Sequence, residues 1–280
     1  GENVKIMGDA AAVEKARKVL NQLVELSRRG NTIEEQKVNY TLSLVMEDSE
    51  ENVLEIDKDV ICHTLQGKPI KPKTLGQKKY VDAIRNKMIV FGLGPAGTGK
   101  TYLAMAMAIT AFKNNEVGRI ILTRPAIEAG EKLGFLPGDA TEKVAPYMQP
   151  LFDNLNVIKR QFASNSTEVK RLEDMQKSEQ LVIEALAFIR GRSLSETYCI
   201  IDEAQNLTPH EIKTIITRAG EGTKMVFTGD IQQIDQPYLD SQSNGLVYMI
   251  DRMKDQNIFA HVNLLKGERS ELSELASNLL

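Results

Sequence analysis

A short glycine-rich segment near the middle of the chain has the residues of a phosphate-binding loop. Residues 94–101 match the pattern G-x-x-x-x-G-K-[ST] at every fixed position. The glycines allow backbone angles that side chains forbid, so backbone N–H groups can approach phosphate oxygens. Lys100 adds a positive charge for the β- and γ-phosphates, and the Thr101 hydroxyl adds a ligand for Mg²⁺. The segment predicts a site for ATP and Mg²⁺, with these nucleotide-binding residues: Gly94, Pro95, Ala96, Gly97, Thr98, Gly99, Lys100, Thr101 and Tyr102.

Two consecutive carboxylates, Asp202 and Glu203, follow the apolar run at residues 198–201. Ligands of open α/β sheets bind at the carboxyl ends of the strands, so Asp202 is expected beside Lys100 and Thr101. We predict that Asp202 and Thr101 hold the Mg²⁺ ion, and that Glu203 is the general base that polarises the attacking water. The alternative is a solvated acidic pair that opens a helix, where Asp and Glu are also favoured.

Two glutamines are candidates for further contacts with the nucleotide. Gln233, supported by Asp230, follows the apolar run at residues 224–228 and is predicted to lie near the γ-phosphate and report its presence. A plain turn is the alternative, because Gly-Asp is a common turn pair. Gln77 precedes the first apolar run, and its side-chain amide is predicted to contact the edge of adenine. An ordinary surface glutamine is the alternative for this residue.

These candidate residues need a sheet that brings several strand ends to one edge. The apolar runs are continuous rather than alternating, which is typical of strands that are buried on both faces. We therefore predict an α/β fold of the P-loop NTPase type, with a mostly parallel sheet that is covered by helices on both faces. The predicted strands are residues 88–93, 119–123, 181–187, 198–201 and 224–228, and the predicted helices are residues 99–113, part of 141–177, and 209–218.

The first 46 residues predict a small β-α unit followed by a second helix. Val4 and Ile6 alternate with a polar residue, as in a strand. A helix is expected over residues 9–29, and a capping box that begins at Thr32 predicts another helix over residues 32–46. Such a unit cannot bury its apolar face alone, so it is expected to pack on a neighbouring surface.

The distribution of charge divides the chain. The 35 Lys and Arg residues against 38 Asp and Glu residues give a net charge of −3, so any nucleic acid must bind a local patch. Residues 66–88 form such a patch, with a net charge of +6. We expect an N-terminal unit at residues 1–46, an acidic linker at residues 47–65 and an ATPase core at residues 66–280. The apolar runs are too short to span a membrane and no signal peptide opens the chain, which predicts a cytoplasmic protein with no membrane partner.

Longer stretches of the chain resemble the PhoH family of ATPases, whose core is similar to the first RecA-like lobe of superfamily 1 helicases. The resemblance covers about residues 66–280 and implies a RecA-like fold. The first thirty residues look like the second half of a KH-type module, but no GxxG clamp is present, so docking is favoured over RNA binding for this piece. The chain departs from the family pattern at Gln232, where Thr is usual, and before Arg269, where a hydrophobic pair is usual. The matching stretches are residues 74–80, 94–101, 123–131, 133–139, 190–192, 202–205, 217–218 and 228–233.

The chain has room for only one RecA-like lobe, so the arginine that a second lobe would supply must come from elsewhere. We predict a ring-shaped homo-oligomer, a hexamer, with ATP at the subunit interfaces. Arg218 and Arg269 are the favoured catalytic arginines, and Arg192 and Arg124 are further candidates. The family resemblance points to the same assembly.

The function that we adopt is an RNA-directed, helicase-like ATPase that acts in RNA processing or ribosome maturation with a protein partner. The basic stretch at residues 66–88, which includes Tyr80, is the expected track for single-stranded RNA, and a charged linker is its alternative. Residues 123–125 are a second candidate contact with nucleic acid. The main rival is a nucleotide-dependent switch that regulates a protein partner. A small-molecule kinase is a weaker rival, because Glu203 and Gln233 would activate water at the γ-phosphate.

Overall fold

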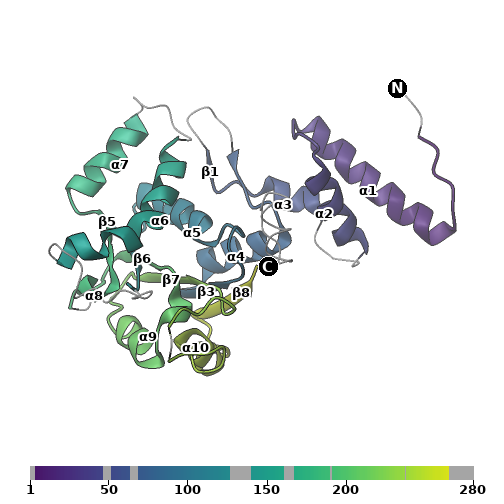
Figure 1. The fold of residues 1–280 in the computed structure, drawn as a ribbon. Coiled ribbons are helices and arrows are strands. Elements are labelled where there is room, and N and C mark those ends of the chain that lie inside the picture. Colours follow the sequence, from purple (N-terminus) through teal and green to yellow (C-terminus); the bar gives the residue numbers. More distant parts are fainter. Residues whose placement is uncertain are drawn as a thin grey trace.

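The centre of the molecule is a six-stranded parallel sheet (Figure 1). The computed structural model describes residues 4–46, 52–63, 69–126, 140–160, 167–189, 191–236 and 238–264. The strands lie in the order β5-β4-β6-β7-β3-β8, and each neighbouring pair is parallel. The strands are β3 (Ile89–Leu93), β4 (Arg119–Arg124), β5 (Leu181–Ala185), β6 (Thr197–Ile201), β7 (Lys224–Gly229) and β8 (Phe259–Asn263).

Helices cover both faces of this sheet, as the continuous apolar runs predict. Alternate residues of a strand point to opposite faces, so Val90 packs in one core while Phe91 packs in the other. The first face carries α4 (Leu75–Asn86), α5 (Lys100–Lys113), α6 (Ala140–Arg160) and α7 (Thr167–Lys177). The second face carries α8 (Leu186–Ile189), α9 (Pro209–Ile216) and α10 (Gly245–Met253). The α/β fold expected from the sequence is confirmed.

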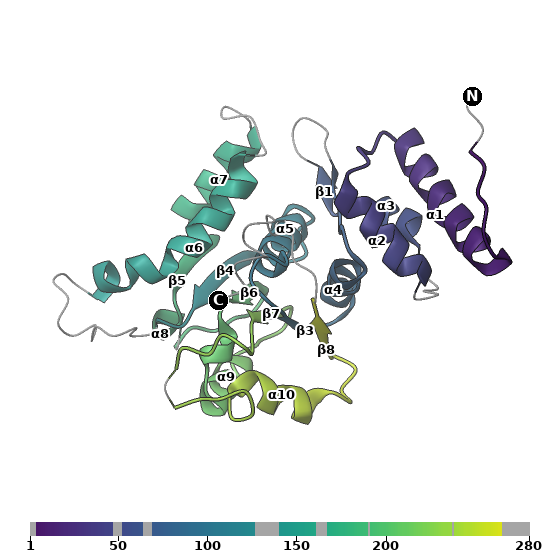
Figure 2. The ribbon, with the colours of Figure 1, turned by 45° about the vertical axis from the view of Figure 1, so that its right-hand side comes forward.

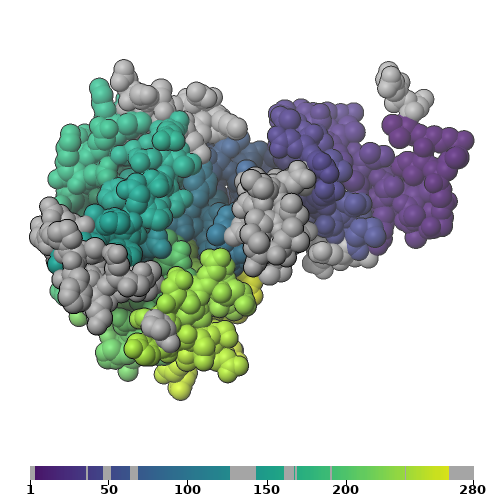
Figure 3. All heavy atoms as spheres, viewed as in Figure 1, coloured from purple at the N-terminus to yellow at the C-terminus, as the bar shows by residue number. Residues whose placement is uncertain are grey.

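Three N-terminal helices form a separate lobe at one side of the sheet (Figures 2 and 3). They are α1 (Ala10–Arg28), α2 (Glu35–Met46) and α3 (Val53–Lys58). The lobe has its own small core, which contains Leu26, Leu44, Val53 and Ile56. A short antiparallel pair, β1 (Cys62–His63) with β2 (Pro69–Ile70), leads from this lobe into α4.

The N-terminal segment departs from the sequence prediction in two places. The strand expected at Val4 and Ile6 is wrong, because residues 4–7 have no regular structure and Val4 is exposed. The capping box is wrong as well, since α2 begins at Glu35 itself and Thr32 therefore lies too early to cap it. The first helix is confirmed, and Asp9 caps it by accepting a hydrogen bond from the backbone N–H of Ala12 at 2.9 Å.

Within the sheet domain the differences concern element ends and one edge. The fifth strand ends at Ala185 rather than at residue 187, because α8 begins there. The edge strand β8 and the helices α4, α8 and α10 were not predicted, and α4 occupies about half of the basic stretch at residues 66–88. The stretch that we expected as an acidic linker contains α3 and β1, and the boundaries of the three parts stay predictions. Within the described residues, every helix is too short or too polar to traverse a lipid bilayer.

Candidate functional site

The phosphate loop connects the end of β3 to the start of α5. Gly99 is the residue before the helix and has a left-handed backbone (φ 82°, ψ 9°), which favours glycine. Gly94 also has a positive φ of 150°, and a Cβ atom there would collide with the backbone carbonyl of Leu264, just after β8. The edge strand that the sequence did not reveal therefore packs directly against the loop, and only glycine at position 94 allows this approach.

The Lys100 side chain folds back over the loop. Its ammonium donates hydrogen bonds to the carbonyl oxygens of Gly94 at 2.5 Å and Pro95 at 2.9 Å. The first turn of α5 presents backbone N–H groups and the positive end of the helix dipole at the same place. A lysine charge, a helix N-terminus and a glycine loop therefore meet at one point, which is the arrangement that binds phosphate.

The metal-binding prediction concerns Asp202 and Thr101, and the structure brings these two residues together. The Thr101 hydroxyl donates to Asp202 Oδ1 at 2.8 Å, and the Thr228 hydroxyl donates to the same oxygen at 2.6 Å. This set of hard oxygen atoms suits Mg²⁺, which usually binds one or two protein groups together with phosphates and water. In the described part of the chain there is no group of three or more His, Cys, Asp or Glu side chains that could cage a metal without such help.

Thr228 is a site residue that sequence reasoning missed. It is the last but one residue of β7, next to β6 in the sheet, so its position at a strand end was the available signal. We now expect it to orient Asp202.

Glu203 lies beside the proposed metal site in an unusual conformation. Its backbone is left-handed (φ 53°, ψ 36°), which costs energy for a residue with a side chain and is common at functional sites. Burial, and then the charge of Asp202, raise the pKa of the Glu203 carboxyl above its ordinary value. Gln205, Arg124 and Lys100 oppose this shift, with the Arg124 guanidinium 3.6 Å from Oε1. A carboxylate with a raised pKa is a better proton acceptor.

The side chain of Gln205 connects Glu203 to the loop after β7. Its Nε2 donates to Glu203 Oε2 at 2.5 Å and to the Gln233 carbonyl at 2.9 Å. Its Oε1 accepts from the backbone N–H of Asp230 at 3.1 Å. Gln205 is completely buried, and sequence reasoning did not select it. The available signal was its position two residues after Glu203. This residue fixes the spacing between the general base candidate and the predicted γ-phosphate sensor.

Gln77 is not an ordinary surface residue, because its side chain is buried against the phosphate loop. Its Nε2 donates to the Thr98 carbonyl at 3.1 Å, and its Oε1 accepts from the backbone N–H of Lys73 at 2.8 Å. The amide therefore supports the loop. One N–H group of this amide remains for a ligand, and contact with adenine stays a prediction.

A cavity of about 740 Å³ opens between these groups, a size that is usual for small-molecule sites. Its lining includes the phosphate loop, Asp202, Glu203, Asp230 and Gln233. The lining also includes β2 with Lys71, and residues of α6 such as Asn154, Val157 and Arg160. Gln77 lines the cavity as well, so the predicted nucleotide, metal and base residues face one space.

Comparison with known proteins gives the family. A family model described as "PhoH-like protein" matches residues 69–278. The chain belongs to the PhoH-like family. A PhoH-like protein of Bacillus subtilis is 45% identical over 239 residues, which are 85% of this chain and 72% of that protein. Protein PhoH of Escherichia coli is 32% identical over 262 residues, which are 94% of this chain and 70% of that protein.

Two solved helicase structures are also similar to this PhoH-like chain. The UvsW helicase from bacteriophage T4 has a TM-score of 0.42 at 15% identity, covering 89% of this chain and 78% of that one. The Pif1 helicase from Candida albicans has a TM-score of 0.38 at 15% identity, covering 73% of this chain and 42% of that one. The family assignment depends on the family model and the sequence relatives, and these two structures add nothing to it.

Among the candidate catalytic arginines that the structure describes, Arg218 and Arg192 do not line the cavity. Arg218 lies between α9 and the start of β7, so it is at the amino ends of the strands, whereas the phosphate loop is at their carboxyl ends. Arg192 forms an ion pair with Glu184 at 3.2 Å, and Arg124 contacts Glu203 within the same chain. Arg269 lies outside the described residues. A role for Arg218 or Arg269 in the site of a neighbouring subunit stays a prediction.

The basic stretch of the PhoH-like chain is arranged differently from a nucleic-acid track. The inclusion of Tyr80 in such a track is wrong, because its ring is completely buried and its hydroxyl donates to the Lys100 carbonyl at 3.3 Å. Lys78 and Arg85 form ion pairs with Asp59, at 3.1 Å and 2.7 Å. Part of the positive charge therefore stabilises the fold.

Proposed function

We propose that this PhoH-like chain binds Mg²⁺ and ATP in the cavity and hydrolyses the ATP. The observation that carries the proposal is the 2.8 Å hydrogen bond between Thr101 and Asp202, because it joins the first turn of α5 to the acidic end of β6. A hydroxyl and a carboxylate placed together beside a phosphate loop are the usual protein share of a magnesium–triphosphate site. Mg²⁺ and ATP, when bound, supply the divalent charge and the reacting phosphorus.

We assign proton transfer, phosphate binding and γ-phosphate sensing to residues of this chain. We assign Glu203 the role of general base, with its carboxylate accepting a proton from the attacking water. Its raised pKa supports this role, because a stronger base accepts the proton more readily at neutral pH. Lys100 supplies positive charge to the phosphate oxygens. Gln205 holds the Gln233 loop against Glu203, which supports the proposal that Gln233 senses the γ-phosphate.

We further propose that single-stranded RNA directs this ATPase, in a helicase-like role in RNA processing or ribosome maturation with a protein partner. The family supports this proposal, as does the position of Arg124 at the carboxyl end of β4, where one side chain can contact both a bound strand and Glu203. A ring of six chains in the cytoplasm, with Arg218 or Arg269 of a neighbour completing each site, belongs to the same proposal.

Nucleotide binding tests the first part. The Kd of Mg²⁺–ATP is measured by calorimetry for the wild type and for Lys100→Ala and Thr101→Ala. We expect each variant to bind at least about tenfold more weakly, because each loses contacts with a charged ligand worth roughly 1.5–3 kcal/mol. Lys113→Ala and Thr110→Ala are matched controls at the far end of the same helix, and their Kd should not change. Equal affinity in all five proteins would contradict the proposal.

Turnover tests the second part. Steady-state ATP hydrolysis is measured with and without single-stranded RNA of several sequences, at low and high salt. A stimulation that weakens as salt rises is expected for contacts with a phosphate backbone. Slow hydrolysis that no RNA stimulates at any salt concentration would instead favour the nucleotide-dependent switch.

A further inference from the structure

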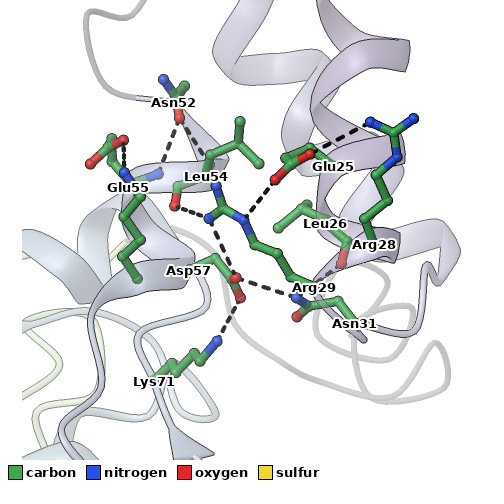
Figure 4. A network of polar contacts seen from close by, with 11 residues as sticks. Glu25, Leu26, Arg28, Arg29, Asn31, Asn52, Leu54, Glu55, Asp57 and Lys71 are labelled. Atoms are coloured by element: carbon green, nitrogen blue, oxygen red, sulfur yellow. Dashed lines mark hydrogen bonds and ion pairs between the residues drawn. The ribbon is translucent and has the colours of Figure 1, made fainter.

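A buried carboxylate apart from the catalytic residues connects the N-terminal lobe to the nucleotide pocket. Asp57 of α3 is only 8% exposed. Its Oδ1 accepts from the Lys71 ammonium at 2.9 Å, and its Oδ2 lies 3.3 Å from Asn31 Nδ2 and 3.9 Å from Arg29 Nη1 (Figure 4). A buried charge of this kind is costly unless it is paired, so these contacts must be maintained for the fold to be stable.

The contacts behind Asp57 fix it to the end of α1. Arg29 directly follows α1, and its guanidinium also donates to the Leu54 carbonyl at 3.1 Å and to Glu25 Oε1 at 3.3 Å. Asn31 donates to the Leu26 carbonyl at 3.2 Å. Figure 4 shows Arg29 and Asn31, which follow α1, pointing toward the Asp57 carboxylate of α3. Asp57 therefore takes its position from the N-terminal lobe as a whole.

The contacts in front of Asp57 lead into the cavity. Lys71 directly follows β2 and lines the cavity. Two residues later, the backbone N–H of Lys73 donates to Gln77, and Gln77 donates to the Thr98 carbonyl of the phosphate loop. A continuous series of contacts thus runs from α1 through Asp57 and Lys71 to the nucleotide site.

The chemistry of this part of the cavity lining suits a nucleoside. The phosphate loop and the acidic pair account for the triphosphate and its metal, so we expect the base and ribose of a bound nucleotide to contact the remaining lining, which β2 and α6 supply. Ile70 and Val157 offer apolar surface to a base, while Asn154 and Lys71 offer polar groups to its edge or to the ribose. The segment at β2 is short, with two paired residues, and Ile70 packs in the main core, while the ion pair of Lys71 with Asp57 adds a contact to the N-terminal lobe.

We propose that Asp57 is a positioning residue for nucleotide binding. By pairing with Lys71, it holds β2 (Pro69–Ile70) in contact with the nucleoside, and through this contact the N-terminal lobe controls the affinity for nucleotide. This inference rests on the proposed function, because it requires a nucleotide in the cavity. Coupling between a remote lobe and a ligand site is typically 5- to 150-fold in affinity. The surrounding charges agree: burial lowers the pKa of the Lys37 ammonium below its ordinary value, the Asp57 charge opposes this shift, and the nearby Lys71 and Lys73 add to it. Without the Asp57 charge, these cations would repel one another and displace β2.

The test compares two ligands that differ in the nucleoside. Mg²⁺–ATP occupies the whole cavity, whereas Mg²⁺–tripolyphosphate reaches only the phosphate loop and the metal site. We expect Asp57→Asn and Lys71→Met to weaken ATP binding about fivefold or more, and to leave the Kd of tripolyphosphate within about twofold of the wild type. Glu55→Gln is the matched control, because this carboxylate lies on the same helix and pairs with Lys58 at the exposed surface. Its affinity for both ligands should equal that of the wild type.

Each other outcome is decisive. Unchanged ATP affinity in Asp57→Asn overturns the inference, and so does an equal loss of ATP and tripolyphosphate, which would indicate general damage to the phosphate loop. If Asp57→Asn does not fold, Arg29→Gln replaces it, because this side chain also contacts Asp57 and is less deeply buried. The exposed Arg28→Gln is its control, and the Kd values of Mg²⁺–ATP and Mg²⁺–tripolyphosphate are compared in the same way. A wild type that binds neither ligand would refute the proposed function instead.

Discussion

Replacing Gln205 by Glu should raise the pH that is needed to ionise the general base candidate Glu203. Glutamate has the shape of glutamine and keeps an oxygen for the Asp230 N–H, which Gln205 Oε1 accepts at 3.1 Å. It has no N–H to donate to Glu203 or to the Gln233 carbonyl. The substitution therefore removes the 2.5 Å hydrogen bond that stabilises the ionised form of Glu203, and it places a second carboxyl group at the same distance.

The size of the effect follows from that hydrogen bond. A hydrogen bond to a charged group contributes about 1.5–3 kcal/mol. Because the ionised form of Glu203 loses this stabilisation, the pKa of its carboxyl rises further above the ordinary value. Repulsion between neighbouring carboxylates acts in the same direction. Burial already raises this pKa, so the two effects add. Because the general base must be deprotonated, activity should be lost at a higher pH as the solution is acidified.

The assay is the pH dependence of kcat for Mg²⁺–ATP hydrolysis from about pH 5 to pH 9, with the acid limb of the profile as the readout. We expect this limb to move up by at least about one unit in Gln205→Glu. Gln232→Glu is the matched control, because it adds the same charge to an exposed position near the loop. An acid limb that stays in place, with kcat lowered equally at every pH, would refute the assignment of Glu203 as the base that Gln205 tunes.

Two further substitutions test the site and the sheet. Glu203→Gln should lower kcat by about 10²–10⁴-fold while ATP still binds. The substitution should also raise Tm, by about 2–4 °C for each kcal/mol of stability gained. The gain should be larger at pH 8 than at pH 5, because burial and Asp202 raise the pKa of Glu203 and so make its ionised form costly at high pH. Thermal unfolding at the two pH values measures this difference. Gly92→Ala should destabilise the fold by about 1–3 kcal/mol in urea unfolding, since a Cβ would lie 2.5 Å from the buried Tyr80 ring. Gly118→Ala, whose Cβ would meet nothing closer than 3.9 Å, should cost little.

The parts of this molecule that depend on local pattern were predictable from the sequence. The phosphate loop needs glycine, lysine and threonine at fixed spacing, and strands buried on both faces need continuous apolar runs. These two constraints placed Lys100, Thr101 and Asp202 at one edge of the sheet. The structure brings those residues together because the strand ends of a parallel sheet share an edge.

The parts that depend on tertiary contacts were not predictable. The strand β8 alternates in burial, so it lacks the continuous apolar run of the other strands, and it forms because β3 offers a free edge. Gln205 lies only two residues after Glu203, but its importance comes from its partners Asp230 and Gln233 in the loop after β7, which the sequence does not place beside it. Tyr80 was placed with the lysines around it, whereas the helix α4 turns its ring away from them into the core.

The opposite charges of residues 47–59 and 66–88 were interpreted separately, as a linker and as an RNA track, because a sequence does not state which charges meet. In the structure, Asp57 and Asp59 receive Lys71, Lys78 and Arg85, and both carboxylates are almost completely buried. Ion pairs of buried groups are screened by salt far less than exposed charges. Lys71, Lys78 and Arg85 are engaged within the chain, so a salt dependence of RNA binding would report on other cations. The net charge of +6 over residues 66–88 is consequently a poor guide to the charge that a nucleic acid would meet.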